Sequence, residues 1–386
     1  MNCKRNERIN PNIVESSAGL YGAQVKLFTP GPIAMDDETI AIGGTQAQYF
    51  RTPEFSKMLL ECEGMLKFAL DAPEDARIIF LTASGTAAME ASVLNLFTPK
   101  DRVLVISGGG FGRRFKEICA IHRIPFESID LEWNEPFRPE MLDRHESGGI
   151  TGLLVNMCET STGQLYPMDH IAAFCKRNNV SLVVDAISAF LCDPFSMKET
   201  GAEAVIISSQ KGLALHPGMS FVALNNKALK ERCAKNEVKS LYFDFKNYIN
   251  DISRGQTPFT PAVAVINQLY EKLQRLRNDG ISASIAYISK LASHCRQRFS
   301  AQKNFYVPDH YSLSNALTPV YCPRRNAKEV FGFLKDGYAV YITPCAGDIA
   351  PFLFRVAHMS RKLTIEDIDN LVDLLKRFEE ELHDCR

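Results

Sequence analysis

Residues 180–211, VSLVVDAISAFLCDPFSMKETGAEAVIISSQK, contain two short apolar runs, and each run leads into charged or polar side chains. The first run, 180–185, ends in the carboxylate of Asp185, and the second, 204–208, leads through Gln210 into Lys211. Apolar runs of this length, rich in β-branched residues, are typical of strands in a parallel sheet that helices cover on both faces. The stretch therefore predicts two buried strands with an acid and a lysine at their carboxyl ends.

Similar apolar runs occur upstream and alternate with helical patterns. The predicted strands cover 77–82, 103–107 and 152–156, and the predicted helices cover 87–97, 113–121 and 168–178. Alternating strands and helices indicate an open α/β sheet. The fold expected for this part of the chain is therefore a mostly parallel sheet with helices on both faces.

The pattern changes beyond Thr260. Helical patterns cover 261–278 and 282–299, strand-like runs lie near Ala316 and Tyr338, and the chain closes with an apolar stripe over 364–382 behind a Thr364 cap. These features predict two domains. The large α/β domain is expected over 29–262, and a smaller α+β domain over 263–386 that also includes 1–28.

Composition narrows the class of protein. The 386 residues carry 44 basic and 45 acidic side chains, a balance that gives no electrostatic footprint for nucleic acid or an anionic membrane. No apolar run is long enough to span a bilayer, and the first residues lack the apolar stretch of a signal peptide. The eleven cysteines are scattered and never spaced CxxC, which indicates reduced thiols. We therefore expect a cytoplasmic protein without nucleic-acid or membrane partners.

Ligands of open α/β sheets bind outside the carboxyl ends of the strands. Those ends carry Ser84-Gly85-Thr86, a glycine-rich turn at 108–112, Thr160 with its hydroxylated neighbours, Asp185, and Gln210-Lys211. Small hydroxylated residues, glycines, one carboxylate and one lysine are thus expected at one edge of the sheet. The sequence predicts a binding site there.

Each of these features has an ordinary structural explanation as well as a functional one. Ser84-Gly85-Thr86 opens a helix, where free amides and the helix dipole suit a phosphate, although the same residues could be a plain N-cap. Asp185 could cap a neighbouring loop, and Lys211 could lie in solvent. Taken together, an anion site, a buried acid and a lysine favour pyridoxal phosphate. This cofactor needs a phosphate cradle, a carboxylate at its ring nitrogen and a lysine that holds it as a Schiff base.

Other cofactor motifs are absent from the sequence. A dinucleotide fingerprint starting at Gly108 would need its third glycine at position 113, which is Arg113. No GxxxxGK[ST] occurs for a nucleoside triphosphate, and no HExxH or clustered His/Cys pattern indicates a metal. We therefore expect no metal site.

Eight short motifs occur in the order found in one family. They are TPGP at 29–32, RTPEF at 51–55, SGTAAMEA at 84–91, GGFGRRF at 109–115, ETSTG at 159–163, VVDAIS at 183–188, SSQKG at 208–212 and QTPFTPA at 256–262. This order resembles class V aminotransferases, specifically the alanine–glyoxylate, serine–pyruvate and 2-aminoethylphosphonate–pyruvate transaminase group. The resemblance covers nearly the whole chain and implies a fold-type I enzyme that uses pyridoxal phosphate.

The resemblance implies a role for each residue of the cofactor site. Lys211 would form the Schiff base and carry the proton, Asp185 would pair with the ring nitrogen, and Thr160 would hydrogen-bond the phenolic oxygen. Phe115 would stack on the ring, at a position where alanine–glyoxylate enzymes carry tryptophan. The residues implied for the phosphate are Ser84, Gly85, Thr86 and Gln210.

The resemblance also implies a substrate clamp and a partner. Thr260 would reach the phosphate of the neighbouring subunit, which requires a homodimer with shared active sites, and Arg355 would bind the substrate carboxylate by bidentate pairing. The reaction expected is transfer of an amino group from a small donor to a 2-oxo acid. The donor would be alanine, serine, aspartate or 2-aminoethylphosphonate, and the acceptor pyruvate or glyoxylate. Met157 stands where many relatives have histidine.

Two alternatives remain at this stage. A lyase of the cysteine desulfurase type needs a nucleophilic cysteine on a mobile loop, and Cys345 is the candidate. At Arg355, the alternative to a substrate clamp is a salt bridge to an acid, which would make this residue structural. A regulator that uses this fold as a ligand sensor would need an appended DNA-binding domain, for which we expect no room before Thr29. His216 is expected to be structural, in a packed turn.

Overall fold

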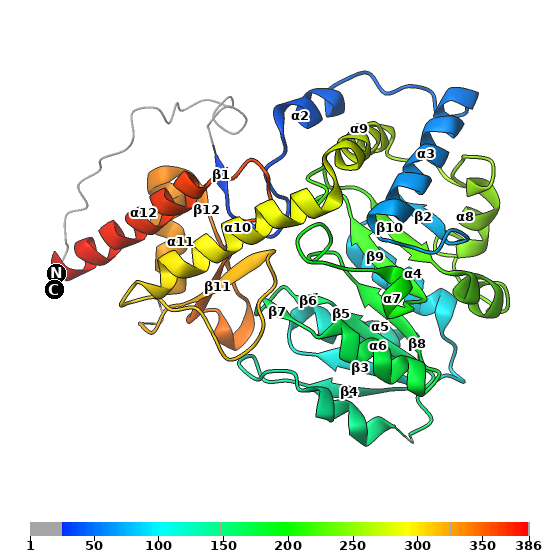
Figure 1. The fold of residues 1–386 in the computed structure, drawn as a ribbon, viewed down its shortest axis with the longest axis horizontal. Coiled ribbons are helices and arrows are strands. Elements are labelled where there is room, and N and C mark those ends of the chain that lie inside the picture. The colour runs from blue at the N-terminus through cyan, green and yellow to red at the C-terminus, as the bar shows by residue number, and fades with distance from the viewer. Residues whose placement is uncertain (1–24, 147, 325, 385–386) are drawn as a thin grey trace.

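A seven-stranded sheet forms the centre of the molecule (Figure 1). The computed structural model describes residues 25–146, 148–324 and 326–384. The strand order is β2 (Arg77–Leu81), β10 (Ser220–Leu224), β9 (Ala204–Ser208), β8 (Ser181–Asp185), β5 (Gly152–Asn156), β3 (Val103–Ser107) and β4 (Phe126–Asp130). β10 runs antiparallel to both of its neighbours, and the other strands share one direction.

Alternate residues of each strand face opposite sides of the sheet, and apolar cores cover both sides. In β2, for example, Ile78 and Phe80 belong to one cluster, and Ile79 and Leu81 belong to another. The first cluster is completed by α3 (Pro53–Ala69), α6 (Met168–Arg177) and α9 (Val263–Asp279), and the second by α4 (Gly85–Leu96), α5 (Gly110–Ile121) and α8 (Phe245–Ile252). Helix, sheet and helix thus form three layers.

A separate apolar core lies in the C-terminal part, at the left of Figure 1. It is built by α10 (Ile281–Ser300), α11 (Ala327–Tyr338) and α12 (Ile365–Asp384) around a sheet of β11 (Leu317–Tyr321), β14 (Leu353–Ala357) and β13 (Thr343–Pro344). Phe28 and Ile33 join this core, and β1 (Lys26–Leu27) pairs in parallel with β12 (Val340–Tyr341). The two-domain division stays a prediction. α9 packs in the core of the large sheet, which favours a boundary after α9 instead of at residue 262.

The α/β fold predicted from the sequence is confirmed, and so are the five apolar strands. The C-terminal helix is also confirmed with its cap, because Asp367 N donates to Thr364 Oγ1 at 3.2 Å. The sequence analysis missed β4, an edge strand with only two apolar residues, Phe126 and Ile129, and it missed α3 and α11.

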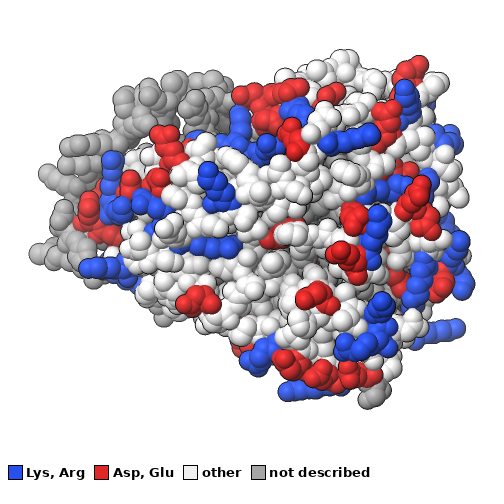
Figure 2. Space-filling view, viewed as in Figure 1, with Lys and Arg blue, Asp and Glu red and all other residues white. Residues whose placement is uncertain are grey.

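Charged side chains of both signs are interspersed on the face shown in Figure 2. This agrees with the balanced composition and gives this face no large patch of one sign. Among the described residues, no helix is long and apolar enough to cross a membrane. Within the same residues, no group of three or more His, Cys, Asp or Glu side chains is arranged to hold a metal ion, and the nine cysteines there are free and buried.

Candidate active site

The carboxyl ends of the parallel strands meet at one edge of the sheet, and the predicted site residues gather there. β8 ends at Asp185, and β9 ends at Ser208, shortly before Lys211. The start of α4 lies beside β9, because a Cβ added to Gly85 would lie 3.6 Å from Ser208 Cβ. Asp185 and Lys211 lie close enough to shift each other's pKa. The structure therefore brings the acid, the lysine and the helix start together.

Asp185 is a buried carboxylate without a cationic partner. It is 5% exposed, and its Oδ1 accepts one hydrogen bond, from Ile187 N at 2.8 Å. It forms no ion pair in the part of the chain that the structure describes. Burial raises the pKa of Asp185 from its usual 3.8 to about 6, although the Ile187 amide and Lys211 act in the opposite direction. Such a group is poised to receive a cationic ring nitrogen.

Lys211 is held in a confined space. Burial lowers the pKa of its ammonium from 10.5 to about 8; Asp185 opposes this change, and Arg355 adds to it. The side chain lies against Gly31, where an added Cβ would be 2.9 Å from both Lys211 Cδ and Lys211 Cε. Gly31 also has φ +146°, a backbone conformation that residues with a side chain rarely adopt. The TPGP turn thus leaves room for the lysine only because it carries glycine.

The start of α4 has the features of an anion cradle. Ser84 caps the helix, and its Oγ accepts from Ala87 N at 3.4 Å. Gly85 has no space for a side chain, since an added Cβ would lie 2.5 Å from Ile187 Cδ1. Nearby, the buried hydroxyl of Ser208 has no hydrogen-bond partner among the described residues. The helix N-terminus and this free hydroxyl suit a phosphate group.

The prediction that Phe115 stacks on the cofactor ring is wrong. Phe115 is fully buried in the cluster beneath α4 and α5, where no ligand can reach it. Phe111, one turn earlier, is half-buried in the first turn of α5, and the guanidinium of Arg114 lies over its ring at 4.8 Å from the centroid. The sequence analysis missed both Phe111 and Arg114, although both lie within the GGFGRRF motif.

Glu159 was also missed, and it anchors the turn that carries Thr160. Its carboxylate is completely buried and accepts from Gly112 N at 3.2 Å, Asn156 Nδ2 at 3.0 Å and Ser161 N at 3.0 Å. The hydroxyl of Thr160 is buried and lies 2.7 Å from Ser188 Oγ. Thr160 therefore has a fixed place at the edge of the sheet.

Arg355 joins the C-terminal part to this turn. It lies on β14, and its Nη1 donates to Thr160 O at 3.1 Å and its Nη2 to Pro344 O at 2.9 Å. Its Nε has no partner, and Arg355 forms no ion pair with any acid that the structure describes. The salt bridge that would make Arg355 purely structural is therefore not seen. A half-buried cation that contacts only neutral groups favours binding of an anion.

For Gln210 and Thr260, no side-chain hydrogen bond to the other predicted site residues is seen among the described residues. Gln210 directly precedes Lys211 and is half-buried. Thr260 is exposed, together with a groove lined by 47–50 and 260–264. It does not cap a helix, because α9 begins only at Val263.

The remaining residues singled out in the sequence have structural contacts. His216 packs in its turn as expected, and its Nδ1 lies 2.7 Å from Gln268 Nε2. Met157 is 3% exposed and its amide donates to Asp185 O. Cys345 is buried, which raises the pKa of its thiol, and its Sγ donates to Ser161 O at 3.5 Å. A buried, protonated thiol is a poor nucleophile, so these contacts do not favour the desulfurase alternative.

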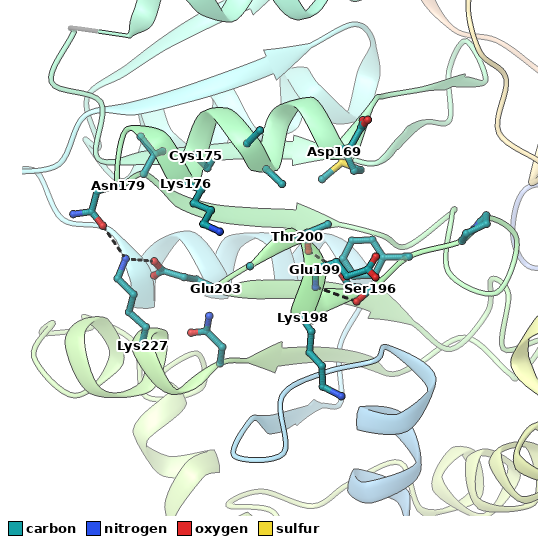
Figure 3. Close-up of a pocket in the computed structure, with 18 residues that line it drawn as sticks. Asp169, Cys175, Lys176, Asn179, Ser196, Lys198, Glu199, Thr200, Glu203 and Lys227 are labelled. Atoms are coloured by element: carbon teal, nitrogen blue, oxygen red, sulfur yellow. Dashed lines mark hydrogen bonds and ion pairs between the residues drawn. The ribbon is translucent and has the colours of Figure 1, made fainter.

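A large cavity of about 870 Å³ lies away from this cluster, at the amino ends of β8 and β9 (Figure 3). The charged groups at its β8–β9 end have partners. Lys227 Nζ lies 2.9 Å from Glu203 and donates to Asn179 Oδ1 at 3.4 Å, and Ser181 Oγ donates to Glu203 at 2.6 Å. Asp185 and the unpaired hydroxyl of Ser208 lie at the opposite edge of the sheet, which favours that edge as the active site.

Comparison with known proteins agrees with the resemblance predicted from the motifs. The model of the family aminotransferase class-V matches residues 42–350. A 2-aminoethylphosphonate–pyruvate transaminase from Pseudomonas putida (strain KT2440) is 32% identical over 262 residues, which cover 66% of this chain and 69% of that protein. The small subunit of a soluble hydrogenase from Synechococcus sp. is 27% identical over 339 residues, 86% of this chain and 87% of that protein. The solved structure of an alanine–glyoxylate aminotransferase from Nostoc sp. superposes with a TM-score of 0.85 at 22% identity, covering 98% of this chain and 99% of that one.

The raised pKa of Asp185 predicts that this residue destabilises the cofactor-free protein above acidic pH. Between pH 4 and pH 6 the unfolded carboxyl ionises while the folded one stays protonated, so its contribution to stability falls as the pH rises. At pH 8 the free energy of unfolding of Asp185→Asn, measured by urea denaturation, should therefore exceed that of the wild type by on the order of 3 kcal/mol. The difference should shrink towards pH 4.

Asp71 provides a control of opposite sign. Hydrogen bonds from Ser196 and Lys198 lower the pKa of this exposed carboxylate, so Asp71→Asn should lose stability at pH 8 and differ less from the wild type on acidification. An Asp185→Asn protein that is no more stable than the wild type at pH 8 would contradict the assigned burial cost.

Proposed function

The chain belongs to the class V aminotransferase family, and we propose that it transfers an amino group from a small donor with one anionic group to pyruvate or glyoxylate. Enzymes of this family use pyridoxal phosphate. The observation that supports the substrate class is Arg355, a half-buried cation beside Thr160 without an acidic partner among the described residues. A carboxylate or phosphonate group would satisfy it.

The residues of the sheet edge fit the cofactor. Asp185 is a buried carboxylate that lacks a cation, which the protonated ring nitrogen would supply. Ser84, Gly85 and Thr86 at the start of α4, together with Gln210 and the free hydroxyl of Ser208, would hold the phosphate. Phe111 takes the stacking role first expected of Phe115, because it lies in the first turn of α5.

Each side chain would then have a distinct task. Bound pyridoxal phosphate withdraws electrons from the bonds at the α-carbon of the substrate. The amine of Lys211 would hold the cofactor covalently, and once freed by the substrate it would take the α-proton and return it, which its lowered pKa favours. Thr160 would hydrogen-bond the phenolic oxygen and keep the ring in register with Asp185.

The surrounding arginines favour donors with a single anionic group. A dicarboxylic donor such as aspartate would need a second free cation near the clamp. Arg51 donates to Gln256 Oε1 and Thr257 O, Arg254 pairs with Asp251, and Arg324 pairs with Glu379. Arg114, another arginine at this edge without an acidic partner in the described residues, donates to Thr86 at the start of α4 and would serve the cofactor side of the site. Alanine, serine and 2-aminoethylphosphonate therefore fit better than aspartate.

A donor screen tests this proposal. Purified holoenzyme should transfer the amino group of alanine, serine or 2-aminoethylphosphonate to pyruvate or glyoxylate with a kcat/KM at least about tenfold above that for aspartate. Tenfold corresponds to the loss of about one ionic hydrogen bond, about 1.4 kcal/mol. Aspartate as the preferred donor would mean that a second cation reaches the substrate.

Replacement of Arg355 tests the clamp. Arg355→Lys keeps the charge but loses the planar fork, so kcat/KM for the donor and for the 2-oxo acid should fall together, by roughly 10- to 100-fold. Both half-reactions use the same pocket and can be followed separately by single-turnover absorption spectroscopy. Arg254→Lys, at an exposed ion pair with Asp251, is the matched control and should leave both values unchanged. A loss confined to one half-reaction would show that donor and acceptor are held by different groups.

We further propose a homodimer in which Thr260 completes the phosphate site of the neighbouring subunit. Two observations support this proposal. Thr260 is exposed beside an open groove that includes Tyr49 and Phe50, and Tyr49 is 69% exposed. An exposed threonine and aromatic side chain next to an open groove suit contact with a second copy of the chain.

Subunit mixing tests whether Thr260 acts across a dimer interface. Lys211→Ala should abolish turnover, and Thr260→Ala should weaken cofactor affinity by about tenfold, the effect of one hydrogen bond to a charged group. In a mixed dimer, the site that keeps Lys211 would receive Thr260 from the other subunit. Mixing the two inactive proteins at low cofactor concentration should therefore restore activity, and sedimentation should give dimers throughout. If Thr260 served its own subunit, mixing would restore nothing.

A further inference from the structure

Arg114 lies between the start of α4 and the aromatic ring of Phe111. Its Nη1 donates to Thr86 Oγ1 at 3.0 Å, and its guanidinium carbon lies 4.8 Å from the centroid of the Phe111 ring. The side chain is half-buried, and it forms no ion pair with an acid in the ranges that the structure describes. Arg114 also lies close enough to the carboxyl edge of the sheet for its positive charge to lower the pKa of Asp185. In addition to Arg355, Arg114 is therefore a second arginine at this edge without an acidic partner among the described residues.

The hydrogen bond to Thr86 determines where the threonine proton can point. A guanidinium has only donors, so in this contact the oxygen of Thr86 must be the acceptor. The hydroxyl proton of Thr86 is then free to be donated to another group, and the neighbouring charge polarises it. Thr86 is the second residue of α4, so an anion in front of the helix start is the natural acceptor.

The contact with Phe111 fixes the guanidinium from the other side. A cation that lies over an aromatic face is attracted by the ring and also restricts its movement. Phe111 and Arg114 lie three residues apart in α5, where side chains face the same side of a helix. One arginine thus contacts a residue of the phosphate cradle and the aromatic ring at the same edge.

We propose that Arg114 is a positioning residue for the cofactor phosphate. It directs the hydroxyl proton of Thr86 towards the phosphate, and its contact with the Phe111 ring holds the guanidinium in place for this task. This inference rests on the proposed cofactor site at the start of α4. It assigns a function to a residue that does not itself need to touch the reacting atoms.

A double-mutant cycle tests the coupling between Arg114 and Thr86. The four proteins are the wild type, Arg114→Met, Thr86→Val and the double variant, and the measured quantity is the dissociation constant of pyridoxal phosphate from the full-length protein. Each single change should raise this constant by about tenfold. The double variant should be no weaker than Thr86→Val by more than about twofold, because Arg114 acts through the hydroxyl that is already lost. Effects that multiply in the double variant would overturn the proposal, and so would an unchanged constant in Arg114→Met.

Two further variants separate position from charge. Arg113→Met removes the same charge from the neighbouring exposed position of α5, and it should leave the dissociation constant unchanged. Arg114→Lys keeps the charge without the planar group, so its loss of affinity should lie between those of the wild type and Arg114→Met. The ³¹P chemical shift of the bound cofactor should move in Arg114→Met and Thr86→Val but not in Arg113→Met. A shift that moves equally in Arg113→Met would show that only net charge matters.

Labelling distinguishes failure of this inference from failure of the proposed function. Borohydride treatment of the wild-type holoenzyme should fix the cofactor to Lys211, and peptide mass spectrometry would locate it. A label on a different lysine, or none, would refute the cofactor site itself. A label on Lys211 together with an unaffected Arg114→Met protein would refute only the role of Arg114. Urea unfolding of each variant shows whether it is folded, and Arg114→Lys still tests the inference if Arg114→Met is not.

Discussion

The site depends on one buried carboxylate, Glu159, that no cation neutralises in the described structure. Amides from the start of α5 and from its own turn, together with the side-chain amide of Asn156, donate to its two oxygens. These donors come from segments that follow different strands, so the carboxylate fixes their relative positions. Gly109 must be glycine here, because an added Cβ would lie 2.4 Å from the Glu159 carboxyl carbon. The turn held in this way carries Thr160, whose carbonyl in turn receives Arg355 of the C-terminal part.

Three charged side chains near this turn have no ion-pair partner among the described residues. Asp185 is buried without an ion-pair partner, Lys211 has a lowered pKa, and Arg355 has no acidic partner in the part of the chain that the structure describes. Each arrangement is unfavourable for the chain by itself. In the proposed function each would become favourable on binding of the matching group: a ring nitrogen for Asp185, a carbonyl carbon for Lys211 and an anion for Arg355. Local frustration of this kind is expected at functional sites and is offset by the packed layers of the sheet.

The strands and their polar ends could be predicted because burial on both faces demands apolar runs, and the next polar residue marks the edge. The choice of Phe115 failed for a reason of helix register. The family resemblance implied Phe115, but α5 begins at Gly110, so Phe111 lies in its first turn and Phe115, one turn later, faces the core. β4 escaped prediction because this edge strand contains only two apolar residues, one towards each face of the sheet, and so forms no apolar run. Glu159 and Arg114 could not be found, since their roles depend on contacts between segments distant in sequence.

The position of Gly31 against Lys211 has a consequence for how the enzyme is made. The turn that encloses the lysine belongs to a segment whose flanking residues, Phe28 and Ile33, pack in the C-terminal core, and β1 pairs with β12. This early segment can therefore dock only after the chain has been synthesised to residue 341 and beyond. Because chains are synthesised from the N-terminus, the lysine pocket can close only after β12 has left the ribosome. A nascent chain that stalls before β12 would hold the sheet and the lysine but could not enclose a cofactor.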